Sequence, residues 1–264
     1  MSAAVYAHTW LGHTLDAVEN CLIESDWFDA ALEISEHIKY RASGAKVVAH
    51  DVSDTGRDAK AVVVRHGARV LSLGLMHTGS ASDGLDWALR YVDDHAADSF
   101  IYDADGVGLG LAREVERALG SRTINFDGYR GGERCVDPDV MYDGHRKNRD
   151  VFYNRKSQSY WELRMRFLRT YQALGGEYMD PDELIFLDPK DPQIPQLRSE
   201  LCRLPLKPNA QGKIQIMPKT EMAKAPFHLP SPNLADALMM SFSVRDYLTN
   251  SWAAPIEYRE AAYI

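Results

Sequence analysis

The stretch from residue 99 to residue 115, SFIYDADGVGLGLAREV, constrains the fold more than any other part of the chain. An apolar segment at 100–102 is followed at once by Asp103 and Asp105, then by a glycine-rich turn and a helical pattern that begins near Leu109. In open α/β sheets, the carboxyl ends of such strands are where functional sites form. The stretch therefore predicts an α/β protein with acidic side chains at one edge of its sheet.

The three glycines of this turn suggest a nucleotide-binding fingerprint, which the spacing does not support. A G-x-G-x-x-G pattern begun at Gly106 requires glycine where Leu111 stands, and one begun at Gly108 requires it where Arg113 stands. The preceding aspartate would also repel a pyrophosphate. We interpret the glycines as a tight connection between a strand and a helix.

The order of the expected elements indicates a particular sheet. Residues 46–52, 61–65 and 69–75 read as three strands joined by short turns, which is typical of an antiparallel meander. A helix over 83–94 then returns the chain to the strand at 100–102, and such a crossover implies parallel pairing. This is the ribonuclease H-like order. We expect a fifth strand at 183–188, long helices over 154–173 and 192–204, and a turn-rich loop over 120–143.

We predict an α/β, ribonuclease H-like fold: a mixed five-stranded sheet with helices on both faces. An N-terminal helical arm or linker over 1–45 precedes the main domain at 46–250, and a tail follows at 251–264. A β-hairpin extension is expected around the short strand at 212–217. The arm includes a helical pattern over 26–38.

Composition sets limits on the kind of protein. The chain has 264 residues, 45% of them hydrophobic, and a formal net charge of −8, which argues against nonspecific nucleic-acid affinity over the whole surface. No apolar run approaches the roughly 18 residues of a membrane span. The three cysteines are isolated, so neither a disulfide framework nor a zinc motif is indicated. We expect an intracellular protein that does not enter a membrane.

Two further aspartates are candidates to join those of the opening stretch. Asp51 ends the first strand, where aspartate is disfavoured unless a turn or a ligand needs it. Asp236 lies in a helix that is apolar nearly all round, which we expect to begin at Pro232 with Ser231 as its N-cap. A buried carboxylate needs a partner, and a metal ion would supply one. We read Asp51, Asp103 and Asp236 as one metal-binding cluster.

A basic segment offers a surface for phosphates. Between residues 145 and 169 the charge balance reverses, and aromatic residues are interleaved, which is the pattern expected of nucleic-acid contact. A solvated basic face is the alternative. A second, weaker patch surrounds Lys219. The candidate DNA-binding residues are Arg146, Lys147, Arg149, Arg155, Lys156 and Lys219.

Taken together, these motifs resemble a known family, the nuclease domain of the large terminase subunit of tailed bacteriophages, which package DNA by the headful. The resemblance spans most of the chain and depends on the joint order of short motifs. These are KVVAHDVSDTG from residue 46, IYDADGVG from 101, NRKSQSYW from 154, GKIQI from 212 with Lys219, and SPNLADAL from 231. The early HTWLG at 8–12 is similar to the stretch that closes the ATPase half of such proteins.

The resemblance implies a metal-dependent endonuclease that cleaves double-stranded viral DNA with little sequence preference during packaging. By position, Asp51, Asp103 and Asp236 match the catalytic acids, and Asp105 is an additional metal candidate. Two Mg²⁺ or Mn²⁺ ions are the implied cofactors. The implied partners are the ATPase half, the small terminase subunit and the portal protein, in the host cytoplasm. The sequence holds no G-x-x-x-x-G-K-[ST] motif, so we expect no ATPase in this chain.

Three other functions remain open from the sequence. A Holliday-junction resolvase or transposase would share the fold and the acids. An ATP-binding module of the actin and sugar-kinase type also combines a meander with glycine turns. A non-catalytic docking module of the packaging machine would bind no metal.

Overall fold

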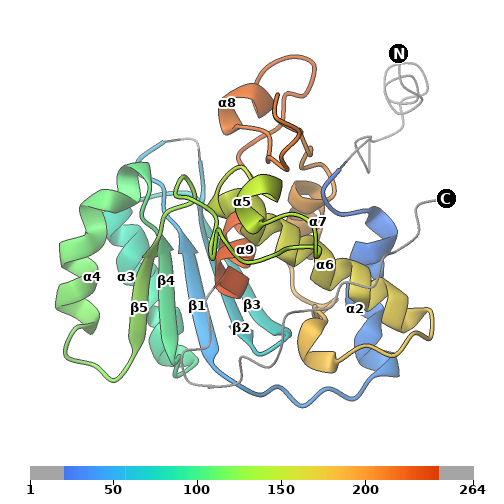
Figure 1. The fold of residues 1–264 in the computed structure, drawn as a ribbon. Helices are drawn as coiled ribbons and strands as arrows, with labels where there is room; N and C mark the ends of the chain where they lie inside the picture. Colours follow the sequence, from blue (N-terminus) through green and yellow to red (C-terminus); the bar gives the residue numbers. More distant parts are fainter. Residues whose placement is uncertain (1–20, 57, 244–264) are drawn as a thin grey trace.

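The computed structural model describes residues 21–56 and 58–243, and the fold is built on one sheet of five strands (Figure 1). The strand order is β3-β2-β1-β4-β5. The strands are β1 (Lys46–Asp51), β2 (Lys60–His66), β3 (Arg69–Met76), β4 (Ser99–Asp103) and β5 (Asn125–Tyr129).

The pairing of the strands confirms the predicted mixed sheet. β1 pairs with β2 and β2 with β3 in antiparallel fashion, whereas β1 pairs with β4 and β4 with β5 in parallel. The helix α3 (Ala81–Asp94) makes the crossover from β3 to β4. Because β1 and β4 are parallel neighbours, their carboxyl ends reach the same edge of the sheet.

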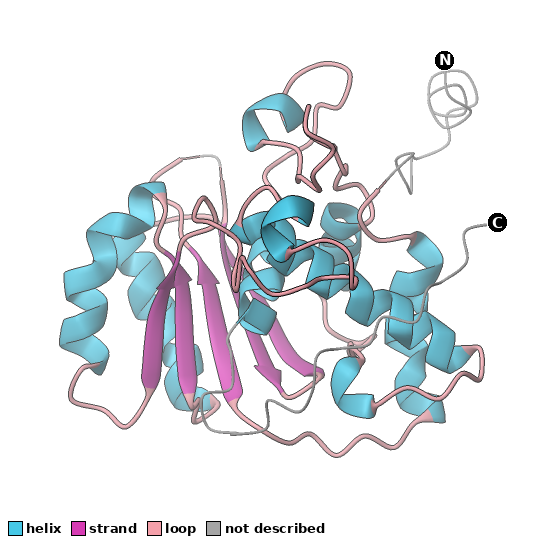
Figure 2. Ribbon diagram, in the orientation of Figure 1, coloured by secondary structure: helices cyan, strands magenta, loops and turns pink. Residues whose placement is uncertain are grey.

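Helices cover both faces of the sheet, as Figure 2 shows. Alternate residues of a strand point to opposite faces, and β1 follows this rule: Val48 packs with α3 and α4, whereas Val47 and Ala49 pack with α2, α6, α7 and α9. The remaining helices are α2 (Ser25–His37), η1 (Gly106–Leu111), α4 (Ala112–Leu119), α5 (Asn148–Val151), α6 (Arg155–Leu174), η2 (Pro181–Glu183), α7 (Ile194–Leu201), α8 (Lys219–Met222) and α9 (Asn233–Ser243).

The prediction of the fifth strand was wrong in its position. The fifth strand is β5, which lies within the segment expected to be a loop. Its sequence NFDGY carries Asn, Asp and Gly, which are depleted in strands, and β5 lies at the edge of the sheet with exposed residues, so it has no apolar signal.

The segment at 183–188 runs beside β3 instead of forming a strand of the sheet. Phe186 bridges Arg69, accepts a hydrogen bond from Val70 N at 2.9 Å and donates one to Ala68 O at 3.0 Å. Leu184 to Leu187 are all buried, because this segment is covered by other elements on both sides. The apolar run in this segment therefore indicates burial and not pairing within the sheet.

The hairpin extension is present without regular strands. Leu206 bridges Ile216, and backbone hydrogen bonds join Lys207 N to Gln215 O and Asn209 N to Lys213 O. This segment and α8 lie above the carboxyl edge of the sheet in Figure 1.

The predicted N-terminal helix is α2, and it packs into the main core against α6, where the rings of Phe28 and Phe167 stack at 5.8 Å. On α6, Tyr160, Leu163 and Phe167 are buried, whereas Tyr171 is exposed. The candidate motif at 8–12 and the predicted tail at 251–264 lie outside the described residues. Among the helices described, none is both long and apolar enough to cross a membrane.

Candidate active site

The sheet and α9 bring together the three aspartates that the sequence singled out. Asp51 is the last residue of β1 and Asp103 the last of β4, and the register that pairs His50 with Tyr102 places the two aspartates side by side. Asp236 comes from α9, which packs against β1 and β2. The charges of Asp103 and Asp236 both act on the pKa of Asp51, so the three carboxylates form one electrostatic cluster.

Asp51 is the least solvated of the three. Its residue is 2% exposed, and among the described residues none donates a hydrogen bond to its Oδ1 atom. Burial, together with the negative charges of Asp236 and Asp103, raises the pKa of Asp51 well above its usual value, although Lys219 and Lys156 oppose the shift. Asp51 thus presents a buried oxygen acceptor without a donor in the described part of the chain.

Asp236 is nearly as buried, at 3% exposed, but each of its oxygens lies against a lysine ammonium group. Lys156 Nζ lies 2.7 Å from its Oδ1 atom and Lys219 Nζ lies 3.0 Å from its Oδ2 atom, while Tyr160 donates a hydrogen bond to Oδ1 at 2.6 Å. Burial alone would raise the pKa of Asp236, but the two ammonium groups and the hydroxyl outweigh it and hold the pKa well below its usual range. Asp236 is therefore an anion held by two cations.

Asp103 and Asp105 have different surroundings. Burial raises the pKa of Asp103, whose Oδ1 atom accepts a hydrogen bond from Asp105 N at 2.9 Å. Asp105 is exposed, follows the end of β4, and directs its Oδ2 atom to Gly132 N at 3.3 Å. Gly108 lies against the backbone of Asp103, where a Cβ atom would come within 1.7 Å of the carbonyl oxygen. The glycine turn therefore allows a close approach beside the acid.

The donor atoms of this cluster fit a hard divalent cation. Mg²⁺ and Mn²⁺ prefer carboxylate oxygens, and the unpartnered buried Oδ1 atom of Asp51 is such a donor. The described residues nevertheless contain no group of three or more His, Cys, Asp or Glu side chains arranged to hold a metal ion. The oxygens of Asp236 lie against lysines instead. The ligand chemistry is present, and Lys156 and Lys219 supply the positive charge in this structure.

Five of the six predicted DNA-binding residues separate into two groups. Lys156 and Lys219 lie at the acidic cluster. Arg146, Lys147 and Arg149 lie away from it on the segment before and within α5, where Arg146 pairs with Asp143 at 2.6 Å and the other two pair with Asp139. Their positive charge is thus partly neutralised locally.

Arg155 belongs to neither group. Its guanidinium lies over the ring of Tyr129, 4.6 Å from the centroid, and 3.5 Å from Glu133, and its side chain is only 17% exposed. Packing holds this arginine. Asp54, in the loop after β1, accepts a hydrogen bond from Ala81 N at 3.2 Å at the start of α3.

Sequence reasoning missed two contributors to the site and misplaced one cap. Tyr160 was read as part of a basic, aromatic surface, but it is fully buried and bonded to Asp236. Glu200 was not singled out, although its Oε2 atom accepts a hydrogen bond from Ala235 N. The predicted cap by Ser231 was wrong: α9 begins at Asn233 and the Ser231 hydroxyl has no partner among the described residues. Nothing in local sequence reports such long-range contacts.

Solved structures show what this chain is similar to. The nuclease domain of the large terminase subunit gp2 of bacterial virus Sf6 is 37% identical, with a TM-score of 0.80 over 84% of this chain and 98% of that chain. The chain belongs to the family of phage large terminase nuclease domains. Two structures of a lysine-to-alanine mutant of the same Sf6 domain agree, one with manganese and beta-thujaplicinol (TM-score 0.80) and one with calcium (TM-score 0.79), each at 37% identity over 84% of this chain and 98% of that chain. No family model and no curated protein matches the sequence.

The likeness confirms the predicted family and the ribonuclease H-like fold. It extends over 84% of this chain and over nearly the full length of the Sf6 nuclease domain. It favours a nuclease over an ATP-binding module of the actin type.

Proposed function

We propose that this terminase nuclease domain is a metal-dependent endonuclease that cleaves double-stranded DNA with little sequence preference during the packaging of a viral genome. The observation that carries the proposal is the convergence of Asp51, Asp103 and Asp236 at the carboxyl edge of β1 and β4. Burial raises the pKa of Asp51 and of Asp103, whereas two lysines lower that of Asp236, and such perturbed carboxyls gathered at one sheet edge are typical of functional sites.

Asp51, Asp103 and Asp236 would hold two Mg²⁺ or Mn²⁺ ions, and Asp105 is an additional candidate ligand. The Sf6 domain has been solved with manganese, which supports the choice of ion. Bound divalent ions supply an activated water and stabilise the leaving oxygen during phosphodiester hydrolysis. Asp51 would be a ligand of these ions, because it interacts with both other acids and its Oδ1 atom accepts no hydrogen bond from the described residues.

The lysines have a separate role in the proposal. Lys156 and Lys219 balance the charge of Asp236 in the metal-free protein. If divalent cations neutralised the Asp236 carboxylate, the two ammonium groups would be free to hold phosphate oxygens of the DNA. Arg146, Lys147 and Arg149 would bind the DNA backbone farther from the cut, in competition with Asp139 and Asp143.

Cleavage of supercoiled plasmid tests the proposal. The protein is incubated with plasmid in EDTA, Mg²⁺ or Mn²⁺, beside Asp51→Asn, Asp103→Asn and Asp236→Asn. We expect metal-dependent nicking and linearisation that all three substitutions abolish, with DNA binding retained by Asp51→Asn. The matched control is Asp127→Asn on β5, because Asp127 is exposed and outside the cluster, and it should cut at the wild-type rate. Retained cutting by Asp51→Asn would refute the assignment.

The same assay separates the alternatives. A preference for branched over linear DNA would point to a junction resolvase or transposase. A folded protein that neither cuts DNA nor binds a metal would point to a docking module. In the cell, we propose that the domain acts with the ATPase half, the small subunit and the portal protein in the host cytoplasm, where partners direct the cut.

A further inference from the structure

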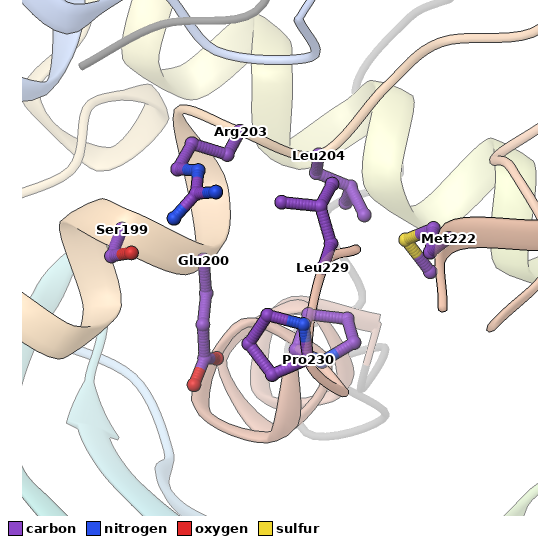
Figure 3. A pocket seen from close by; sticks show the side chains of 8 residues that line it. Ser199, Glu200, Arg203, Leu204, Met222, Leu229 and Pro230 are labelled. Carbon is purple, nitrogen blue, oxygen red and sulfur yellow. The ribbon is translucent and has the colours of Figure 1, made fainter. Parts of the chain in front are cut away.

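A second buried carboxylate, outside the aspartate cluster, lies at the start of α9. Glu200 belongs to α7 and is 7% exposed. Figure 3 shows its side chain extending away from α7 toward the start of α9, with Pro230 beside it. Its Oε2 atom accepts a hydrogen bond from Ala235 N at 2.9 Å, and its Oε1 atom accepts one from Gln196 Nε2 at 2.8 Å. Both oxygens are therefore fixed by protein donors.

This contact supplies what the local sequence does not. The first backbone N–H groups of a helix have no partner within the helix, and at α9 the nearby Ser231 hydroxyl makes no hydrogen bond with the described residues. Glu200 reaches the helix from another element and places a carboxylate where the helix dipole favours negative charge. The cap of α9 is thus a tertiary contact.

The surroundings of Glu200 restrict its movement. It lines a small pocket, and its two carboxylate oxygens are held by Ala235 N and Gln196 Nε2. The other lining residues are mostly apolar: Ser199, Arg203, Leu204, Met222, Leu229, Pro230 and Pro232. Burial and the nearby charge of Asp236 raise the pKa of Glu200 to about 7.

The residue after Ala235 is Asp236, so the bond from Glu200 fixes the turn of backbone that carries the third acid. A small rotation of α9 at this point would move the Asp236 carboxylate relative to Asp51 and Asp103. The backbone N–H of Leu234, in the same turn, also acts on the Glu200 carboxylate.

We propose that Glu200 is a positioning residue: by capping α9 through Ala235 N, it holds Asp236 at the sheet edge in the orientation that metal binding requires. The inference rests on the proposed function of the acidic cluster. Groups that orient metal ligands typically change metal affinity when they are replaced, whereas a residue that only fills space does not.

The test compares Glu200→Leu, Glu200→Gln and the control Ser231→Ala. Mn²⁺ binding is measured by calorimetry, and hydrogen exchange of the Ala235 amide is measured by NMR. Glu200→Leu should bind Mn²⁺ roughly tenfold more weakly and lose protection at Ala235. Glu200→Gln retains an acceptor oxygen and should restore both readouts to within about twofold, because one well-placed hydrogen bond is kept. Ser231→Ala should change neither, because its hydroxyl has no partner among the residues that the structure describes.

Cleavage adds a third readout. For Glu200→Leu, more Mn²⁺ should be needed for half-maximal cutting, while the rate at saturating Mn²⁺ approaches that of the wild type. Unchanged Mn²⁺ affinity and Ala235 protection in Glu200→Leu would overturn the proposal. If Glu200→Leu shows no cooperative melting, Gln196→Leu is measured instead. This change removes the donor to Glu200 Oε1 and should weaken Mn²⁺ binding about threefold, the lower range for one hydrogen bond. Unchanged Mn²⁺ binding in Gln196→Leu would equally overturn the proposal. If the wild type binds Mn²⁺ but cuts no DNA, the proposed function fails while the positioning readouts still stand on their own.

Discussion

Removing the charge of Asp51 and removing that of Asp236 should change the stability of the metal-free protein in opposite directions. Both residues are buried, but their partners differ: Asp236 contacts two lysines, whereas the Asp51 Oδ1 atom has no donor among the described residues. The opposite pKa shifts of the two carboxyls follow from this difference. Asp51→Asn and Asp236→Asn therefore form a matched pair.

For Asp236→Asn we expect a loss of stability. Its pKa is lower in the folded protein than in the unfolded chain, so its contribution is fully present at neutral pH and is lost only as the pH falls through the folded-state pKa. Breaking a buried ion pair costs roughly 3–5 kcal/mol. Lys156 and Lys219 reach solvent, with side chains 28% and 43% exposed, which reduces our estimate to about 2 kcal/mol.

For Asp51→Asn we expect a gain in the stability of the metal-free protein. Its pKa is raised in the folded protein, so the folded state holds more protons than the unfolded chain between the two pKa values, and stability falls as the pH rises through that window. A neutral amide of the same shape removes the cost, which we place at about 1 kcal/mol, as for other strained functional sites. The same change should abolish cutting.

The assay is thermal unfolding in EDTA at pH 7.5, followed by circular dichroism. At about 2–4 °C per kcal/mol for a domain near this size, Asp236→Asn should lower the Tm by about 4–8 °C and Asp51→Asn should raise it by about 2–4 °C. Asp127→Asn serves as the control and should leave the Tm unchanged. Shifts of the same sign and size for both cluster variants would show that the electrostatic reasoning is wrong.

Three further predictions follow from the same geometry. Gly108→Ala should cost about 2 kcal/mol of unfolding free energy and slow DNA cutting, because its Cβ would meet the Asp103 carbonyl. The control Gly110→Ala, whose Cβ would have nothing within 4 Å, should change neither urea unfolding nor plasmid cutting. In EDTA, the unfolding free energy should fall as the pH rises from about 4.5 to 7, because the pKa of Glu200 is raised to about 7 in the folded state. Urea unfolding of Glu200→Gln should show a flatter dependence of the unfolding free energy on pH, and an unchanged dependence would contradict this cause. Lys219→Ala should lower the Tm in EDTA and gain more from added Mn²⁺ than the wild type does, because the ion replaces the lost positive charge; equal gains would contradict that role.

Local pattern was enough to place most elements and the three acids. The helix predicted over 83–94 is α3, and the one over 154–173 is α6, because each carries an amphipathic pattern that depends only on neighbouring residues. Asp51 and Asp103 were found because each follows an apolar strand, and the parallel pairing of those strands follows from the crossover between them. Asp236 was found because a charge in an apolar helix is costly without a partner.

Only the tertiary structure decided which residues far apart in the sequence contact each other. An edge strand such as β5 has one unpaired side and little apolar content, so its sequence looks like a loop until β4 is beside it. Lys156 and Lys219 could be identified as basic, but only the packing of α6, α8 and α9 shows that both contact Asp236. The cap from Glu200 to Ala235 joins residues 35 positions apart. Short-range patterns determine which residues form helices and strands and which are charged, whereas the ionisation and orientation of each acid depend on neighbours that only folding brings close.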